Sequence, residues 1–341
     1  MTLPYENTLQ PVLNGPPILA DYPQYVEPLP ADQRFLAPAV VNDPNGTLLV
    51  RAWRYWYNAH GIVEMENRLD PKATAALVVH PWGIDDDHGF RTPEPNGVRF
   101  FCTVPKNRIG QQHMREVVDS FLRQWRSHLA LISYSLPLQE DPIRRLLYAS
   151  VNTPPEALRP KEGERQLAEA VRQRSLLHGQ PLTPGLTLDE RAPATSYMDQ
   201  TPSTNARDFY NGPDFATLPM PLSSAITYVP TDRIFYDDEG YEKARDFMRK
   251  LGVRHILLAG YCTDMCVKAT TCGYDNLRKD FNVFLVGDAT LATFPASTTP
   301  RYATQVALAN AALTELVTQV SWIRTAKTNL RESKRRRTEV V

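Results

Sequence analysis

The stretch His255-Ile-Leu-Leu-Ala-Gly-Tyr-Cys-Thr-Asp-Met-Cys-Val-Lys-Ala-Thr270 joins a short apolar run to a cysteine that follows Gly260 by six positions. The apolar run, residues 256–259, predicts a buried strand, and Gly260 predicts the turn that leads into a helix over residues 264–277. Cys266 then lies in the first turn of that helix, where unpaired backbone N–H groups and the positive end of the helix dipole favour a thiolate. This position predicts a nucleophile, although free cysteine is also one of the most buried residue types, so that a packing role stays open.

The composition describes a chain that can bury a large core and that carries no bulk charge. Of the 341 residues 42% are hydrophobic, and 38 Lys+Arg balance 38 Asp+Glu. Because the chain has no overall electrostatic attraction to nucleic acid or membrane surfaces, we expect a small-molecule substrate. The first residues lack a basic segment followed by an apolar one, and no window approaches the roughly 18 apolar residues of a membrane span. We therefore expect a cytoplasmic protein that does not contact membranes.

Three of the four cysteines lie close together, at positions 262, 266 and 272. Their spacing, Cys-x3-Cys-x5-Cys, contains no CxxC pair and has no His-x3-His nearby, unlike the ligand sets of structural zinc sites. So few cysteines in a chain of this length fit reduced thiols better than a disulfide framework. We expect no metal and no cofactor.

The first 45 residues are rich in proline and show little periodicity. This pattern is typical of an extended arm that lies on the surface or on a partner subunit, so we expect a homo-oligomer. Asn45-Gly46 predicts a two-residue turn between strands over residues 39–42 and 47–53. The arm and this hairpin form the first predicted unit, residues 1–70.

Alternating apolar and amphipathic segments predict a three-layer, doubly wound α/β domain over residues 71–320, with a mainly parallel sheet. Continuous apolar runs predict its buried strands, and segments with helical periodicity predict the helices between them. Residues 135–222 are rich in Pro, Arg and Glu and are interpreted as a long insertion. The expected strands are residues 75–80, 129–134, 225–229, 256–259 and 282–288, and the expected helices are residues 111–125, 160–177, 241–251, 264–277 and 301–318.

Three polar or reactive residues end predicted strands or follow them closely: His80, Cys266 and Asp288. In open α/β sheets ligands bind outside the carboxyl ends of the strands. The fold and the candidate nucleophile therefore predict a site at the same edge of the sheet.

Four short motifs surround the candidate nucleophile: Gly260-Tyr-Cys-Thr-Asp-Met-Cys-Val267, Thr270 or Thr271, Gly273-Tyr, and Val286-Gly-Asp-Ala289. In this order they resemble the isochorismatase-like cysteine hydrolases, a family that includes nicotinamidases and N-carbamoyl amidases. The resemblance covers residues 225–320 well and residues 75–134 weakly. It implies the same fold class and a hydrolase with a cysteine nucleophile.

By this resemblance Cys266 is the nucleophile of a triad that also contains an aspartate and a lysine. The resemblance also implies a cis peptide bond directly before or after Cys262. Backbone N–H groups around Cys262, Thr263 and Cys266 would then build the oxyanion hole. We expect Trp82 and Tyr261 to border the substrate pocket, although core packing is the more common role of such aromatic residues.

The other two triad positions depart from the family pattern. The acid at the end of the first core strand aligns with Pro81, beside His80, and the lysine aligns with or near Arg233. Arginine cannot lose its proton as the lysine is thought to, so Arg233 would compensate local negative charge or pair with Asp232 or Asp237. The Asp-x-His metal motif of nicotinamidases is absent as well. Either the constellation has been rebuilt or the catalytic activity has been lost.

A rebuilt site would use His80 as the general base toward Cys266. In this interpretation Asp85, Asp86 or Asp87 returns from the loop after the strand and orients the imidazole ring. The alternative for these three aspartates is a solvated acidic turn.

Residues 321–341 form a basic tail that holds Lys334-Arg-Arg-Arg337 and few apolar residues. Such a composition predicts a disordered, solvated segment. Nucleic-acid binding is not expected apart from this tail.

Two functions are consistent with these patterns. The first is a cysteine-dependent hydrolase that acts on an amide or related C–N or acyl bond of a small molecule, through a thioester on Cys266. The second is a catalytically degenerate protein of the same fold that serves as a binding or assembly module, which would explain the missing acid and lysine. The two differ in the reactivity that they predict for Cys266.

Overall fold

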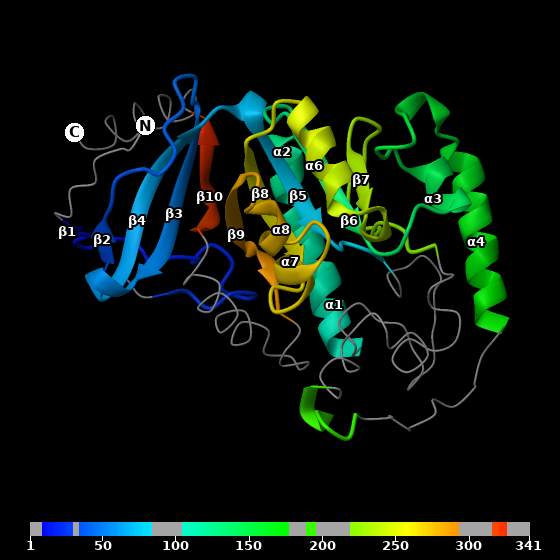
Figure 1. Ribbon diagram of the computed structural model, residues 1–341, viewed down its shortest axis with the longest axis horizontal. Coiled ribbons are helices and arrows are strands. Elements are labelled where there is room, and N and C mark those ends of the chain that lie inside the picture. Colours follow the sequence, from blue (N-terminus) through cyan, green and yellow to red (C-terminus); the bar gives the residue numbers. More distant parts are fainter. Residues whose placement is uncertain are drawn as a thin grey trace, which may run out of the picture.

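The computed structural model describes residues 9–29, 34–83, 104–176, 189–195, 219–292 and 316–325, which form one mixed sheet with helices on both faces (Figure 1). Within these ranges the strand order is β1-β2-β4-β3-β10-β9-β8-β5-β6-β7. The strands are β1 Gln10–Pro11, β2 Arg34–Leu36, β3 Leu48–Trp56, β4 Gly61–Leu69, β5 Thr74–Val79, β6 Leu131–Leu136, β7 Arg233–Tyr236, β8 His255–Tyr261, β9 Asn282–Leu291 and β10 Leu316–Thr325.

The half of the sheet from β10 to β7 is parallel throughout. Every residue of β5, β6 and β8 is buried. Strands that are covered on both faces require continuous apolar runs, which is the pattern that predicted them. The doubly wound, mainly parallel α/β fold is confirmed.

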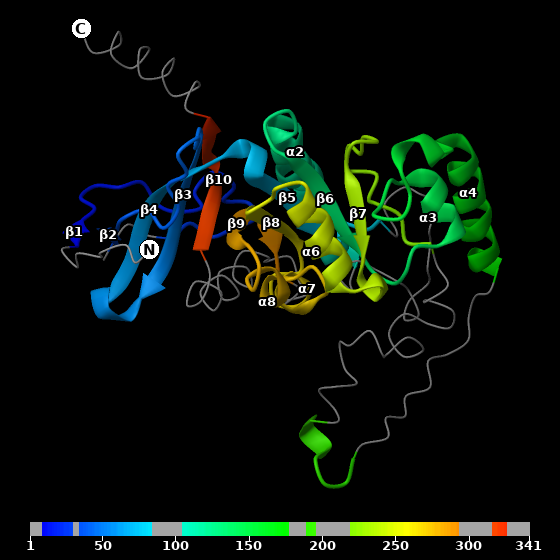
Figure 2. The same cartoon turned by 45° about the horizontal axis from the view of Figure 1, so that its top comes forward.

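Helices cover the two faces of this parallel half (Figures 1 and 2). One face carries α1, a π-helical segment η3 and α2, which together connect β5 to β6, and the opposite face carries α6, α7 and α8. The pair α3 and α4 lies beyond the edge strand β7. The helices are α1 Val104–His113, η3 Met114–Asp119, α2 Ser120–Trp125, α3 Pro142–Leu147, α4 Pro160–Leu176, α6 Tyr241–Lys250, α7 Cys266–Ala269 and α8 Tyr274–Leu277, with short 3-10 turns η1 Tyr57–Ala59, η2 Pro71–Ala73, η4 Pro155–Ala157 and η6 Asp237–Glu239.

The direction of the chain across the sheet reverses between β5 and β8, which are neighbours. From β5 the chain continues to β6 and β7 on one side, whereas from β8 it continues to β9 and β10 on the other side. The connections leave these two strands in opposite directions, and in open α/β sheets ligands bind outside the carboxyl ends of the strands at such a point.

Gly260 allows β8 to approach β5 at this point. Its φ is +112°, and a Cβ atom on it would lie 2.2 Å from the carbonyl oxygen of Val79. Only glycine fits a backbone of this conformation at this distance.

In the hairpin, β3 pairs with a different strand from the one predicted. β3 pairs with β4 over its full length, around the turn η1, whereas the segment 39–42 contributes one isolated bridge between Asn42 and Arg68. In β4 exposed Glu66 and Arg68 alternate with buried Met65 and Leu69, which is the pattern of a half-buried strand. A nine-residue partner forms many more ladder hydrogen bonds than a four-residue one.

The C-terminal strand β10 corrects two predictions, the end of the helix over residues 301–318 and the start of the tail at residue 321. β10 inserts between β3 and β9, antiparallel to the first and parallel to the second. Its buried Val317, Val320 and Ile323 are β-branched, which favours a strand. Residues 301–315 and 326–341 lie outside the described residues.

Residues 225–229 do not form the expected strand, and the edge strand β7 begins only at Arg233. The N–H of Thr227 donates to the carboxylate of Asp119 at 2.7 Å instead of joining a ladder. Pro230 follows directly and lacks an N–H for a ladder. Neither the hydrogen bond to Asp119 nor the missing N–H of Pro230 is visible in the apolar content of residues 225–229, which is what predicted a strand there.

In the part of the chain that the structure describes, no helix has both the length and the apolar character needed to cross a bilayer.

Candidate active site

Four neighbouring strands deliver polar side chains to one edge of the sheet. His80 follows β5, Ser135 is near the end of β6, Asp237 follows β7, and Cys266 begins α7 shortly after β8. Since β8, β5, β6 and β7 are adjacent and parallel, their carboxyl ends bring these residues together at one edge of the sheet.

His80 contacts both an acid and a thiol. Its Nε2 lies 2.7 Å from Oδ2 of Asp237, and its ring lies close enough to the side chain of Cys266 for the two groups to interact electrostatically. Its backbone N–H donates to the carbonyl oxygen of Ser135 at 2.9 Å. His80 has a φ of +48°, a conformation that is uncommon for residues other than glycine and that recurs at functional sites.

The charge balance at His80 favours an imidazolium. The ring is 6% exposed, and this burial opposes protonation. The charges of Cys266 and Asp237, and the hydrogen bonds to both, outweigh burial and raise the pKa of His80 to about 10. For Asp237 burial acts to raise the pKa, but the charge of His80 and hydrogen bonds from three side chains place it below its usual value.

Donors from three different elements hold the Asp237 carboxylate. His80 and Thr270 both donate to Oδ2 at 2.7 Å, and Ser135 donates to Oδ1 at 3.0 Å. The hydroxyl of Thr271 donates to the main-chain carbonyl of Asp237 at 2.9 Å. Both carboxylate oxygens are therefore satisfied, which favours the ionised form.

The helix expected over residues 264–277 is broken into α7 and α8, each of four residues. Thr270 ends α7 in an extended conformation with ψ of 177°. The chain then turns tightly at Gly273, where a Cβ atom would lie 2.9 Å from the carbonyl oxygen of Cys266. Because α7 is a single turn, its dipole is weaker at Cys266 than that of the longer helix expected from the sequence.

In the segment between β8 and Cys266, one of the N–H groups expected in the oxyanion hole has another acceptor. The peptide bond between Tyr261 and Cys262 is cis, at one of the two positions that the resemblance implied. The N–H of Thr263 donates to the carbonyl oxygen of Leu291 at 2.9 Å, so Thr263 is not available as an oxyanion donor. Cys266 is the first residue of its helix, and its N–H has no backbone acceptor among the described residues.

Tyr261 is buried in the core, with 1% of its surface exposed. Its hydroxyl lies 2.7 Å from Nδ1 of His113 on α1, and Nε2 of His113 lies 2.9 Å from the main-chain oxygen of Asp288. Burial lowers the pKa of His113 to about 4, so the ring is neutral and accepts from Tyr261 while it donates to Asp288. This arrangement does not match a pocket-lining role for Tyr261.

The other predicted site residues do not join the cluster. Arg233 donates to the main-chain oxygens of Pro230, Thr231 and Asp232 at the start of β7, whereas Asp237 follows the end of that strand. Asp85 lies outside the described residues. Trp82 is partly buried and forms a backbone bridge with Leu222.

The residue that orients His80 in the structure is Asp237, which the sequence suggested only as an ion-pair partner of Arg233. Its local signal was its place directly after the strand Arg233–Tyr236, beside the acidic residues Asp238 and Glu239. A strand over residues 225–229 would place Asp237 far from a strand end, so this signal becomes clear only with the true strand β7. The hydroxyls of Ser135 and Thr270 carried no local signal of a site.

A buried lysine, Lys106 on α1, lies close enough to Cys262 and Asp264 to interact with their charges. Burial lowers its pKa, and the charges of Cys262 and Asp264 act in the opposite direction. Lys106 thus places a cation near the turn that precedes Cys266, although no lysine occupies the position expected from the family pattern.

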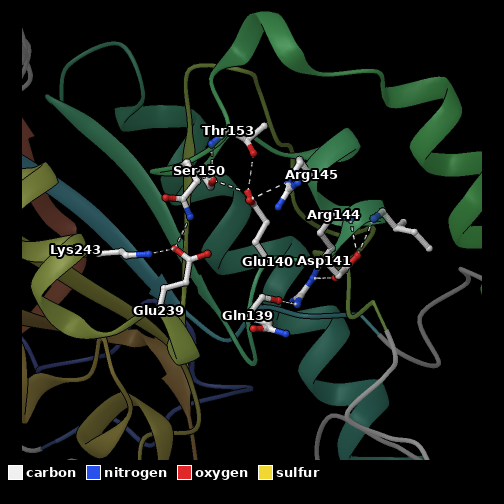
Figure 3. Close-up of polar contacts among 11 residues, drawn as sticks. Gln139, Glu140, Asp141, Arg144, Arg145, Ser150, Thr153, Glu239 and Lys243 are labelled. Carbon is white, nitrogen blue, oxygen red and sulfur yellow. Dashed lines mark hydrogen bonds and ion pairs between the residues drawn. The ribbon is translucent and has the colours of Figure 1, made fainter.

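The segment after β6 forms hydrogen bonds with the turn η6, whose first residue is Asp237. The N–H of Asp238 donates to the carbonyl oxygen of Leu138 at 3.1 Å. Asn152 donates to the carboxylate of Glu239 at 2.9 Å, and Lys243 pairs with the same carboxylate at 3.8 Å (Figure 3).

Two buried charged residues hold this segment itself (Figure 3). The side chain of Arg144 is 1% exposed; it pairs with Asp141 and donates to the carbonyl oxygens of Pro137 at 3.0 Å and Gln139 at 2.5 Å. Its guanidinium also lies 4.7 Å from the ring centre of Tyr236, the residue before Asp237. Glu140 accepts hydrogen bonds from two side chains in the following loop, Ser150 at 2.6 Å and Thr153 at 2.9 Å.

Among the described residues, no group of three or more His, Cys, Asp or Glu side chains is arranged to hold a metal ion.

Residues 235–321 match the family model of the Isochorismatase domain. The matched segment contains Asp237, β8, Cys266 and β9. The resemblance to the isochorismatase-like hydrolases is confirmed for the part of the chain that carries the candidate nucleophile.

Several solved structures are similar at low identity. A cysteine hydrolase from Pseudomonas syringae pv. phaseolicola 1448A is 16% identical over 74% of this chain and 91% of that chain, with a TM-score of 0.40. An isochorismatase family protein from Desulfovibrio vulgaris subsp. vulgaris str. Hildenborough is 12% identical over 73% and 95%, with a TM-score of 0.38. Pyrazinamidase of Pyrococcus horikoshii in complex with zinc is 16% identical over 72% and 99%, with a TM-score of 0.35. No curated protein matches the chain.

Proposed function

We propose that the protein is a cysteine-dependent hydrolase that cleaves an amide or related C–N or acyl bond of a small molecule through a thioester intermediate. The observation that carries the proposal is His80, which contacts Cys266 on one side and Asp237 on the other. A nucleophile, a base and an orienting acid in this arrangement form a catalytic triad, which is recognised by geometry and not by position in the chain. The match of residues 235–321 to the Isochorismatase domain supports a hydrolase.

The reaction begins with the thiolate of Cys266 beside the imidazolium of His80. The thiolate attacks the carbonyl carbon, and the backbone N–H of Cys266 stabilises the resulting oxyanion. As the C–N bond breaks, His80 gives its proton to the leaving nitrogen, so that an amine or ammonia departs and the acyl group remains as a thioester. His80 then takes a proton from water, which attacks the thioester, so that the carboxylic acid is released and the Cys266 thiolate and the His80 imidazolium are restored.

Asp237 keeps the imidazole in the orientation that this exchange of protons needs. Because its Oδ2 engages Nε2 of His80, the carboxylate also compensates the positive charge that His80 carries before it gives up its proton. We therefore assign to Asp237 the role that the sequence analysis left to Asp85, Asp86 or Asp87.

The proposal is tested by incubating the purified full-length chain with a panel of small amides and carbamoyl compounds and measuring released ammonia or amine. Cys266→Ser is expected to reduce turnover at least about 10³-fold, because oxygen at this position is a much weaker nucleophile. Lys268→Met is the matched control, since Lys268 lies on the same helix and its side chain is 52% exposed. Turnover that survives Cys266→Ser would refute the proposal.

The degenerate alternative is favoured by one observation, the proline at the position of the family acid, beside His80. In that case the protein would act as a binding or assembly module, and the N-terminal arm would contact other subunits. It predicts no turnover and a Cys266 that is no more reactive toward alkylating reagents than an ordinary thiol. Labelling with iodoacetamide followed by peptide mass spectrometry distinguishes the two.

A further inference from the structure

We propose that Thr270 is a positioning residue that aims the carboxylate of Asp237 at His80, and that its hydroxyl is needed for the charge state of the histidine. The inference rests on the proposed function, since it assigns a role within the same triad. It adds a fourth side chain to the set formed by Cys266, His80 and Asp237.

The first observation is that two donors share one carboxylate oxygen. The hydroxyl of Thr270 and Nε2 of His80 both lie 2.7 Å from Oδ2 of Asp237, while Ser135 lies 3.0 Å from Oδ1. A carboxylate that receives donors on both oxygens resists rotation about its Cβ–Cγ bond. Without the Thr270 hydroxyl, His80 would be the only side chain that holds Oδ2 in place.

The second observation is that the backbone of Thr270 is itself fixed to the nucleophile. Its N–H donates to the carbonyl oxygen of Cys266 at 3.1 Å, and its carbonyl oxygen accepts from the N–H of Gly273 at 2.9 Å. The side chain of Asn276 adds a weaker contact to the same carbonyl oxygen, at 3.4 Å. Thr270 thus connects the nucleophile to the acid through one residue, its backbone to Cys266 and its side chain to Asp237.

Thr271 provides a matched control in the same turn. Its hydroxyl also bonds Asp237 and at a similar distance, 2.9 Å, but the acceptor is the main-chain oxygen and not the carboxylate. Replacing either threonine by valine removes one hydroxyl and keeps the shape of the side chain. Only the change at Thr270 removes a hydrogen bond from the carboxylate.

When the hydroxyl of Thr270 is lost, the carboxylate is expected to turn toward Ser135, and its bond to His80 weakens. The imidazolium then loses part of its stabilisation, while the burial of the ring still opposes protonation. The pKa of His80 is therefore expected to fall. The free energy that a hydrogen bond to a charged group contributes is about the size of the free energy that shifts a pKa by one unit. The midpoint of the His80 titration should therefore fall by about one unit.

The test is an NMR titration of the histidine ring signals in the full-length chain, with the His80 signal assigned through His80→Gln. The midpoint in the unsubstituted protein is expected near the pKa of about 10. Thr270→Val should lower it by about one unit, while Thr270→Ser and Thr271→Val should leave it unchanged. This readout requires no substrate, and a general loss of packing would affect the two valine variants alike.

An unchanged midpoint in Thr270→Val would overturn the inference and leave the proposed function standing, and so would equal shifts in the two valine variants. If Thr270→Val does not fold, Thr270→Ala takes its place, with Thr270→Ser as its control: the first should lower the midpoint and the second should not. An ordinary midpoint near 6.5 in the unsubstituted protein would overturn the proposed function itself.

Discussion

Nε2 of His80 lies 2.7 Å from Oδ2 of Asp237, although 157 positions separate the two residues in the chain. Each follows a different parallel strand, and β6 lies between the two strands in the sheet. The short distance between them is therefore a product of strand order.

Asp237→Asn is expected to lower kcat/KM by roughly 10²- to 10⁴-fold, because an amide no longer compensates the imidazolium and favours the wrong tautomer. The measurement is steady-state kinetics on whichever amide the screen identifies. Asp238→Asn is the control, since Asp238 is the next residue and is exposed. Equal losses in the two variants would contradict the triad.

The rate at which iodoacetamide labels Cys266 between about pH 5 and 6 should depend on His80. The reason is the neighbouring imidazolium, because the raised pKa of His80, about 10, keeps the ring charged throughout this range. His80→Gln should slow the labelling at least about tenfold, and His128→Gln, at an exposed position, should not. Equal rates in all three proteins would show that the charge of His80 does not reach the sulfur.

Asp288 should make the stability of the fold depend on pH. Its carboxyl is fully buried, and burial raises its pKa to about 8, although the N–H of Val320 donates to it at 2.9 Å. Because the folded pKa lies above the unfolded one, its contribution to stability is fully present below about pH 4 and is lost as the pH rises through about 8. Asp288→Asn should therefore raise Tm more at pH 9 than at pH 5, as measured by thermal unfolding at both pH values. Parallel pH curves would contradict this assignment.

Arg144→Met should destabilise the protein by about 3 kcal/mol, because it removes the buried cation that pairs with Asp141 and the donor to the carbonyl oxygens of Pro137 and Gln139. Arg145→Met is the matched control on the same helix: its side chain is 59% exposed, and its ion pair with Glu140 is expected to contribute less than about 1 kcal/mol. Denaturant unfolding of both variants gives the comparison. A smaller loss in Arg144→Met than in Arg145→Met would contradict the role assigned to the buried guanidinium.

Much of the parallel sheet could be predicted because each buried strand has a local pattern. The apolar runs at residues 75–80, 256–259 and 282–288 are continuous, and a strand covered on both faces requires this. The predictions failed where the partner decides the structure. β10 is a strand because it pairs with β3 on one side and with β9 on the other. α7 ends after four residues because Thr270 leaves the helix and its hydroxyl donates to Asp237.

The sequence by itself determined the fold class, the location of His80 and Cys266 at strand ends, and the resemblance that singles out Cys266. These are properties of short segments, and local periodicity is visible in the residues that form them. Only the tertiary structure decided which acid meets His80, which threonine holds that acid, and that Arg233 and Tyr261 contact other groups. Those contacts join residues far apart in the chain, and they depend on the order of the strands, which no single segment encodes.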